Sequence, residues 1–302
     1  MSTTRLITTR AALRDARAGL SGTVAVVMTM GALHDGHLQL VHRAREVADA
    51  VVLTDFVNPL QFGPGEDYEA YPRQIDADLA LVDGLVDVVF APPVEEMYPV
   101  LPPVVSVSAG QAGRRYEGAM RPGHFDGVLT VVTKLLNLVQ PHVAVFGRKD
   151  AQQLALVQRL VADLDLPVRI DAVDIMREPT GLALSSRNAY LSDAGREQAL
   201  VLSRTIRAVE AAAPSAAAIR AVLDADADGT QPVDAATDTD TASAGDTSAG
   251  EQSVHWDYRL LIDPTTFEEA GEDARGELLV MLAARIEGTR LLDATVVPVT
   301  QP

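Results

Sequence analysis

Short apolar segments alternate with segments of helical periodicity through the first half of this chain, and this alternation constrains the fold more than any other feature. Runs rich in β-branched residues predict strands at residues 24–29, 50–57, 86–91, 104–108, 142–146 and 168–175. Apolar residues spaced three and four positions apart predict helices at residues 36–48, 73–82, 127–139 and 151–164. This order of elements predicts the α/β class, with a Rossmann-like parallel sheet that carries helices on both faces.

The pattern changes after residue 186. Two alanine-rich segments predict helices at residues 194–213 and 215–223, and three apolar segments predict strands at residues 256–262, 278–284 and 291–297. A chain of 302 residues is long enough for two domains with separate cores. We therefore expect a Rossmann-like domain over residues 1–176 and a smaller C-terminal α+β domain over residues 177–302.

The negative charge of the chain is concentrated in one segment. The formal net charge is −17, and residues 221–252 contain eight acidic residues and no basic one. This Asp/Ala/Thr/Ser/Gly segment has no aromatic residue and cannot bury a core, so we expect a disordered insertion there. The rest of the chain carries −9, and this acidic balance argues against nucleic acid as a partner.

The composition also bears on location. The chain has no Cys, which excludes disulfides and thiolate chemistry. No apolar run reaches membrane-spanning length, so we expect no membrane association. Residues 1–20 lack the apolar core of a signal peptide, and we expect a cytoplasmic protein.

The turn His34-Asp35-Gly36-His37 lies between the strand predicted at 24–29 and the helix that follows. Free backbone N–H groups at a helix start bind phosphate, and Gly36 lets a ligand approach the main chain closely. Two His three positions apart share one face of the first helical turn. The same pair could bind a metal ion, although no third His lies nearby, or belong to an ordinary surface turn.

Other polar clusters follow predicted strands, where ligands bind in parallel sheets. Lys149, in the sequence Gly147-Arg148-Lys149-Asp150, could neutralise phosphate charge as a point cation. Asn58 to Phe62 offers amide groups that suit a hydroxy acid, and Leu184 to Asn188 offers hydroxyl groups and a guanidinium. Taken singly, these clusters also fit a helix-start charge pair, an Asn-Pro turn and a Ser-rich turn.

Taken together, the clusters resemble the pantothenate synthetase family of pantoate–β-alanine ligases, within the nucleotidyltransferases that have a HxGH-type turn. The matching strings are TMGALHDGH, FVNPLQF, YPR, RPGHF, GRKDAQQLAL and LALSSRNAYL. Their order and spacing agree with the family over residues 20–205 and again in the C-terminal strands. The similarity to other nucleotidyltransferases covers the first strand–helix unit alone.

The resemblance implies an ATP-dependent, carbon–nitrogen bond-forming ligase, expected to be a homodimer. Pantoate carboxylate attacks the α-phosphorus of ATP, giving a pantoyl adenylate and pyrophosphate. The amine of β-alanine then attacks the acyl carbon, releasing AMP and pantothenate. Cations and dipoles must offset the repulsion between the carboxylate and the polyphosphate. Mg²⁺ is expected on the phosphates, since it prefers oxygen ligands.

The resemblance also assigns residues to the site. ATP contacts are implied for Met30, Gly31, Ala32, Leu33, His34, Asp35, Gly36, His37, Gly147, Arg148, Lys149, Asp150, Met176, Leu184, Ser185, Ser186 and Arg187. Pantoate contacts are implied for Gln61 and Gln153, with Gln61 also near β-alanine and Arg121 near the pantoate pocket.

Three of these residues are the catalytic candidates. The family position that matches His37 is the proton donor, and we expect His34 to act by the charge of an imidazolium. Lys149 is expected to offset phosphate charge. For Mg²⁺ we expect Asp78, with Asp76 as a second candidate.

The chain departs from the family pattern at four positions. Met28, Arg148 and Ala151 replace a usual Pro, Glu and aromatic residue, and Ala77 occupies a position that is often acidic. Arg148 could tighten phosphate binding or slow pyrophosphate release. Two alternative functions follow: a nucleotidyltransferase that adenylylates a phosphate ester, and a non-catalytic or altered-specificity nucleotide-binding paralogue. The first needs further cations for its substrate, whereas Gln61 and Gln153 are neutral.

Overall fold

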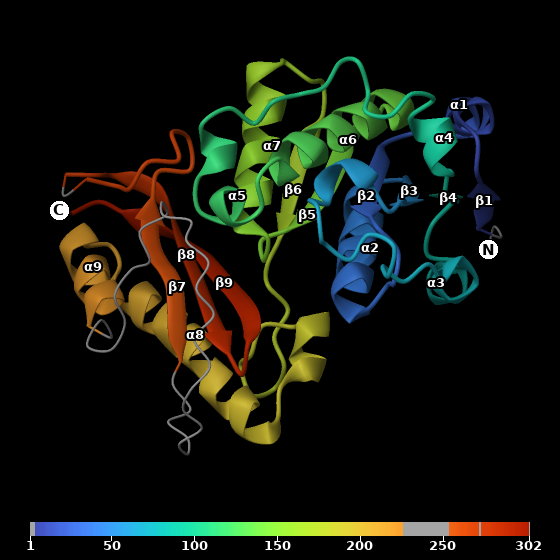
Figure 1. Ribbon diagram of the computed structural model, residues 1–302. Coiled ribbons are helices and arrows are strands. Elements are labelled where there is room, and N and C mark those ends of the chain that lie inside the picture. Colours follow the sequence, from blue (N-terminus) through green and yellow to red (C-terminus); the bar gives the residue numbers. More distant parts are fainter. Residues whose placement is uncertain (1–3, 226–253, 272, 302) are drawn as a thin grey trace. The chain divides into compact units, whose positions relative to one another are not determined.

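The computed structural model describes residues 4–225, 254–271 and 273–301 (Figure 1). The chain divides into two compact units, Met1–Asp174 and Ile175–Pro302. The division falls two residues before the boundary expected from the sequence. Of the acidic segment expected at 221–252, residues 221–224 belong to a helix, and those from 226 onward lie outside the described residues.

A six-stranded parallel sheet forms the first unit, in the order β1-β4-β3-β2-β5-β6. Its strands are β1 Arg5–Ile7, β2 Val24–Thr29, β3 Ala50–Asp55, β4 Val88–Phe90, β5 Val143–Gly147 and β6 Arg169–Val173. Strand β2 lies in the middle and begins with four fully buried residues. Such continuous burial is typical of a parallel strand covered on both faces. The sheet confirms the Rossmann-like fold.

Helices cover both faces of this sheet, as Figure 1 shows. Helices α2, Asp35–Val47, and α3, Ile75–Val82, pack on the face that carries Ala25, Val27 and Leu53. Because side chains alternate between faces of a strand, Val24 and Val26 point to the opposite face. Helices α1, α6 and α7 form the other layer, with bounds Arg10–Gly19, His124–Val139 and Ala151–Asp163.

The strand expected at residues 104–108 does not form. Side chains there are open to solvent, with Val104 92% and Val105 83% exposed. The Val107 N–H donates to Thr130 Oγ1 at 3.0 Å instead of to a neighbouring strand. β-branched residues favour a strand when they can pack on a sheet, and within the described part of this chain no strand is paired with this segment.

Short elements connect the long ones in the first unit. They are the 3₁₀ turns η1 Pro59–Gln61 and η2 Ala112–Arg114 and the helices α4 Val94–Met97 and α5 Glu117–Met120. Residues 59–61 matter for the site, because η1 packs on the start of α6.

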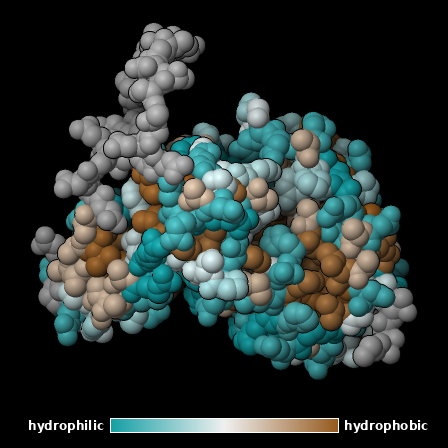
Figure 2. All heavy atoms as spheres, turned by 90° about the horizontal axis from the view of Figure 1, so that it is seen from below, coloured by the Kyte–Doolittle hydropathy of each residue, from teal (hydrophilic) through white to brown (hydrophobic). Residues whose placement is uncertain are grey.

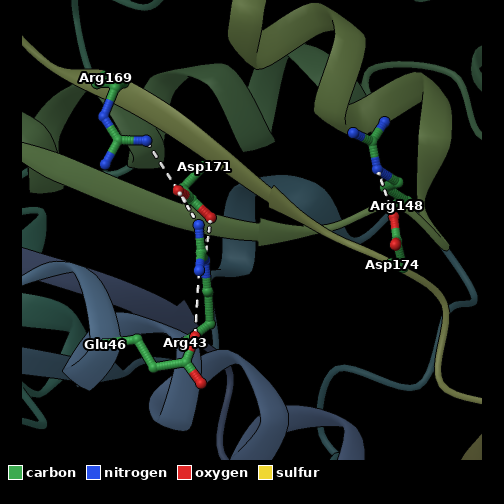
Figure 3. Close-up of polar contacts among 6 residues, drawn as sticks. All are labelled: Arg43, Glu46, Arg148, Arg169, Asp171 and Asp174. Carbon is green, nitrogen blue, oxygen red and sulfur yellow. Dashed lines mark hydrogen bonds and ion pairs between the residues drawn. The ribbon is translucent and has the colours of Figure 1, made fainter.

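An ion-pair network ties α2 to the edge strand β6 (Figure 3). Arg43 donates to the two carboxylate oxygens of Asp171 at 2.8 and 3.2 Å, and Arg169 donates to the same carboxylate at 2.8 Å. The side chain of Asp171 is 7% exposed, and burial strengthens a two-pronged pair of this kind. The network fixes the helix whose first turn contains the two His.

The second unit contains a three-stranded antiparallel sheet of β7 His255–Ile262, β8 Gly276–Ile286 and β9 Thr289–Val299. Helices α8 Asp193–Ala212 and α9 Ala216–Asp224 pack on it, and η3 Ser186–Tyr190 precedes them. This arrangement confirms the smaller α+β domain. No helix in the described ranges is long and apolar enough to span a membrane. The face drawn in Figure 2 is largely hydrophilic, with apolar patches between hydrophilic regions.

Candidate functional site

The candidate site lies where the order of the sheet reverses. The chain runs from β2 through α2 to β3 on one side, and from β5 through α7 to β6 on the other. Because β2 and β5 are neighbours, the loops that follow them flank a topological switch point, where open α/β sheets bind ligands. The His turn follows β2, and Gly147 to Asp150 follow β5.

The turn after β2 adopts an unusual backbone conformation that its amides stabilise. Gly31 has φ 79° and Ala32 has φ 51°, and a left-handed conformation is uncommon for a residue with a Cβ. The Gly31 N–H donates to Thr29 Oγ1 at 3.2 Å. The N–H groups of Ala32 and Leu33 donate to the two oxygens of Asp78 at 2.9 and 2.8 Å.

The two His rings cap the start of α2. The Gly36 N–H donates to His34 Nδ1 at 3.1 Å, and the His34 N–H donates to His37 Nδ1 at 3.4 Å. The ring centroids are 4.1 Å apart. Since each Nδ1 accepts, the hydrogen-bond pattern assigns the proton of each neutral ring to Nε2. The expectation of free helix-start amides is therefore wrong for these two groups, and the rings offer Nε2–H donors in their place.

Burial disfavours the charged form of both imidazoles. Burial, followed by the charge of Lys149, lowers the pKa of His34, and burial with the neighbouring His34 lowers the pKa of His37 to about 4. Burial beside Lys149 thus disfavours an imidazolium at His34, and the charged role expected for this ring stays a prediction.

The loop after β5 lies next to the His turn. The Lys149 charge lowers the pKa of both His34 and His37, and the Asp150 charge raises that of His37. Arg148 points elsewhere: its Nε lies 3.0 Å from a carboxylate oxygen of Asp174 (Figure 3). The lysine expected to bind phosphate is thus beside the His pair, while the unusual arginine is in an ion pair.

Gln61 lies on the other side of the β2 turn. Its Nε2 donates to Met30 Sδ at 3.0 Å, and its Oε1 accepts from Asn58 Nδ2 at 3.1 Å. The Tyr98 hydroxyl donates to Asn58 Oδ1 at 3.0 Å. Asn58 is 1% exposed and Gln61 9%, so this chain of hydrogen bonds fixes the Gln61 amide in a buried position.

Arg121 and His124 hold the main chain of Gln61. His124 Nδ1 donates to the Gln61 carbonyl at 2.8 Å, and Arg121 donates to it at 3.3 Å. Arg121 also pairs with Glu66 at 2.6 Å, which lowers the pKa of that carboxyl. Arg121, expected near pantoate, is thus already engaged with a carboxylate, and its observed contact is with the pantoate-candidate residue Gln61.

Comparison with known proteins gives the family. The model of the pantoate-beta-alanine ligase family matches residues 3–296. The chain belongs to the pantoate–β-alanine ligase family. Pantothenate synthetase from Acidothermus cellulolyticus is 53% identical over 286 residues, which cover 93% of this chain and 88% of that protein. The same enzyme from Salinispora arenicola is 50% identical over 291 residues, 96% of each chain.

Solved structures of pantoate–β-alanine ligases share this architecture. Pantothenate synthetase from Thermus thermophilus superposes with a TM-score of 0.78 at 42% identity, covering 96% of this chain and 98% of that one. Pantoate-beta-alanine ligase from Francisella tularensis, solved with β,γ-ATP and β-alanine, gives a TM-score of 0.70 at 27% identity over 97% of both chains.

The magnesium position expected from the family resemblance does not fit the ion. Asp78 is 1% exposed, and both its oxygens accept main-chain N–H groups. Asp55 is hydrogen-bonded to it, and burial together with the Asp78 charge raises the pKa of Asp55 to about 6. Asp76 is exposed, and the described residues contain no group of three or more His, Cys, Asp or Glu able to hold a metal. Asp78 is therefore not a free oxygen ligand in the structure, since main-chain N–H groups and Asp55 already occupy its carboxylate.

The neighbouring glutamines of α7 have different surroundings. Gln153 is half-buried in the first helical turn. Gln152 is 2% exposed; its amide donates to the carbonyls of Ala112 and Arg115 and accepts from the Glu117 N–H. Gln152 therefore ties α7 to the main chain of residues 112–117, and Gln153 stays the predicted pantoate ligand. Ala151, where family members usually have an aromatic residue, is buried at 8% exposure.

The remaining ATP candidates of the ligase family belong to the second unit. The Leu184 N–H donates to the Met176 carbonyl at 2.8 Å, which folds this segment back on itself. Ser185 Oγ caps the Arg187 N–H at 3.2 Å, and Ser186 and Arg187 are exposed. These residues stay predictions as ATP ligands.

Side chains that the sequence analysis missed build the framework behind the site. Four side chains contact residues of the site that lie 24 to 63 positions away in the sequence: Tyr98, Glu66, His124 and Asp55. No local pattern marks such pairs, although RPGHF, which contains His124, was among the strings that match the family.

Burial of His37 predicts a loss of stability in acid. Its pKa is about 4 when folded and 6.5 as the reference value, so the unfolded chain binds this proton first as pH falls. The stabilisation is complete above pH 6.5 and is lost as pH falls toward 4. Between pH 7 and pH 5 the wild type should lose about 2 kcal/mol more unfolding free energy than His37→Gln, measured by urea titration. His42→Gln, an exposed His of the same helix, is the control; equal losses in wild type and His37→Gln would contradict the assignment.

Gly127 lets α6 approach η1, and a side chain there should displace Gln61. An added Cβ would collide with the Leu60 carbonyl oxygen and lie 2.7 Å from the Gln61 nitrogen. Gly127→Ala is expected to raise the KM for pantoate about tenfold, because overpacking against a main chain forces a shift. Gly19→Ala, where the added Cβ meets nothing within 4 Å, is the control. A KM unchanged in a folded Gly127→Ala variant would contradict the role given to Gln61.

Proposed function

We propose that this chain catalyses the ATP-dependent condensation of (R)-pantoate with β-alanine to give pantothenate, AMP and pyrophosphate. The observation that carries the proposal is that Lys149 lies close enough to His34 and His37 for its charge to lower their pKa values, on loops that flank the switch point between β2 and β5. Membership of the family over residues 3–296 supports it. The departures Met28, Arg148 and Ala151 remove no group that this chemistry needs.

In the first step, a carboxylate oxygen of pantoate attacks the α-phosphorus of ATP. The new P–O bond gives pantoyl adenylate, and the bond to the pyrophosphate oxygen breaks. We assign to Lys149 the offset of negative charge on the phosphates. The Nε2–H groups of His34 and His37 donate hydrogen bonds to the same oxygens, and the neutral amides of Gln61 and Gln153 hold pantoate without adding charge.

In the second step, the amine of β-alanine attacks the acyl carbon of the adenylate. The amine must lose its proton before it attacks, since an ammonium has no free electron pair. The C–N bond forms, the attacking nitrogen loses a second proton, the bond between the acyl carbon and the AMP oxygen breaks, and AMP leaves. A mixed anhydride suits this step, because AMP is a far better leaving group than the oxide of a free carboxylate.

We infer that Mg²⁺ arrives with ATP as part of the substrate, held by phosphate oxygens and water. Mg²⁺ commonly keeps several waters and binds through substrate phosphates. The absence of a fitting carboxylate cluster among the described residues agrees with this assignment. The cytoplasm, where ATP is abundant, stays the predicted location.

We also propose a homodimer. The segment around Val104 and Val105 supports it, because two large apolar side chains at 92% and 83% exposure are unusual for a surface that stays in water. Light scattering on the purified chain should give twice the 32.1 kDa chain mass. A mass of one chain at micromolar concentration would contradict the proposal.

Product analysis tests the proposed reaction. We expect ATP to yield AMP and pyrophosphate in equal amounts, and AMP release to require both pantoate and β-alanine. Pyrophosphate without AMP, with a phosphate ester as acceptor, would favour the nucleotidyltransferase alternative. ATP binding without turnover would favour the non-catalytic paralogue.

A further inference from the structure

Asp78 makes contacts that neither ATP chemistry nor magnesium binding explains. It lies in the first turn of α3, 45 and 46 residues from the amides that it accepts. Its side chain is almost fully buried, and each oxygen receives one N–H, from Leu33 at 2.8 Å and Ala32 at 2.9 Å. A buried carboxylate is retained when hydrogen bonds to it offset the cost of desolvation.

The two amides belong to the turn that leads into the His pair. Ala32 has φ 51°, a left-handed conformation that is uncommon for a residue with a Cβ. Asp55 packs beneath the same turn: a Cβ added at Gly31 would lie 2.5 Å from Asp55 Oδ1. The turn is therefore hydrogen-bonded to Asp78 of α3, and Asp55 of β3 packs against Gly31 and is hydrogen-bonded to Asp78.

We propose that Asp78 is a positioning residue for the loop between β2 and α2. In this structure its carboxylate binds main-chain N–H groups instead of acting as the magnesium ligand expected from the sequence. By fixing the main chain of Ala32 and Leu33, it sets the start of α2 and thus the direction of the Nε2–H groups of His34 and His37. The inference rests on the proposed ATP site, because the loop matters to catalysis through that site.

The surroundings of Asp78 argue against a second role as a metal ligand. Mg²⁺ needs near-octahedral oxygen ligands and water at short distance, whereas the Asp78 oxygens face two N–H groups and have almost no access to solvent. The nearby Asp55 carboxyl is hydrogen-bonded to Asp78, and Ala77 supplies no oxygen ligand from its side chain. A cation would have to break both hydrogen bonds to enter.

Asp78→Asn is the variant that tests the role. The amide keeps the shape, but its NH₂ faces one of the two N–H groups, so one hydrogen bond becomes a repulsive contact. We expect the Kd for ATP, measured by calorimetry in EDTA, to rise about ten- to a hundred-fold, since charge-assisted bonds are lost. We expect hydrogen exchange at the Ala32 and Leu33 amides to accelerate at least about tenfold. The KM for pantoate should change far less.

Asp49→Asn is the matched control. Asp49 accepts the Thr23 N–H at 2.7 Å at the opposite end of β2, so its loss removes a similar carboxylate contact outside the site. ATP affinity and exchange at residues 32 and 33 should stay as in the wild type.

A titration of the wild type with MgCl₂ alone keeps the proposal testable if Asp78→Asn does not fold. We expect the NMR signals of the Ala32 and Leu33 amides to stay in place as Mg²⁺ is added. A saturable shift there would identify Asp78 as a metal ligand and overturn the proposal. Wild-type ATP affinity and exchange in a folded Asp78→Asn variant would also overturn it. The exchange measurement needs no ATP, so it separates this inference from a failure of the proposed reaction.

Discussion

Replacing Lys149 with alanine is expected to slow formation of the adenylate about 10²- to 10³-fold, the usual cost of removing one preorganised charge from a transition state. The reaction brings a carboxylate against a polyphosphate, and Lys149 is the cation that the structure places beside the His pair. Rapid-quench measurement of pyrophosphate in a single turnover, with pantoate and without β-alanine, isolates this step.

Lys149 can be compared with the other lysine of the chain. Lys134→Ala, in α6, should keep the single-turnover rate within about threefold of the wild type. The loss of a catalytic contact would change this rate far more. Lys149→Arg should recover part of the loss and not all of it, because a planar guanidinium does not replace a compact ammonium. An adenylation rate near that of the wild type in a folded Lys149→Ala variant would remove Lys149 from the mechanism.

Replacing His37 with alanine is expected to reduce the adenylation rate by a similar factor, about 10²- to 10³-fold. The substitution removes an Nε2–H donor and also the acceptor for the His34 N–H. Two amide variants separate these roles. Asparagine places its oxygen near the position of Nδ1. It should restore the hydrogen bond from the His34 N–H but not the adenylation rate. Glutamine reaches the position of Nε2 with an N–H and should restore part of the rate.

The control for this series is His42→Ala on the exposed side of the same helix, which should keep the wild-type rate. Equal rates for the asparagine and glutamine variants of His37 would contradict the assignment of the Nε2–H as the donor. A wild-type adenylation rate in His37→Asn would show that His37 acts only as a helix cap.

Strand and helix positions could be predicted wherever burial imposes a regular spacing of apolar residues on the sequence. The strand predicted at 24–29 is β2 with the same bounds, and the helix predicted at 151–164 ends one residue earlier as α7. Short segments were missed: β1 has three residues, and α1 has ten, of which four are charged. The reverse error occurred at residues 104–108, where strand-forming residues have no described partner strand.

Part of the site could also be predicted, because loops after neighbouring parallel strands must meet. The proximity of Lys149 to His34 and His37 follows from that rule. The use of the His rings as helix caps does not, since it depends on ring orientation and burial. The positioning role of Asp78 could not be predicted, because a contact between residues 45 positions apart leaves no local sequence pattern.

Adenylation of pantoate is tested most directly by following one of its carboxylate oxygen atoms. When the carboxylate carries ¹⁸O and both substrates are present, attack on the α-phosphorus leaves one labelled oxygen on AMP after β-alanine displaces it. Adenylation of the carboxylate predicts AMP with one ¹⁸O atom and unlabelled pyrophosphate. Labelled inorganic phosphate together with ADP, or AMP without label, would contradict adenylation of the carboxylate and with it the role given to the site between β2 and β5.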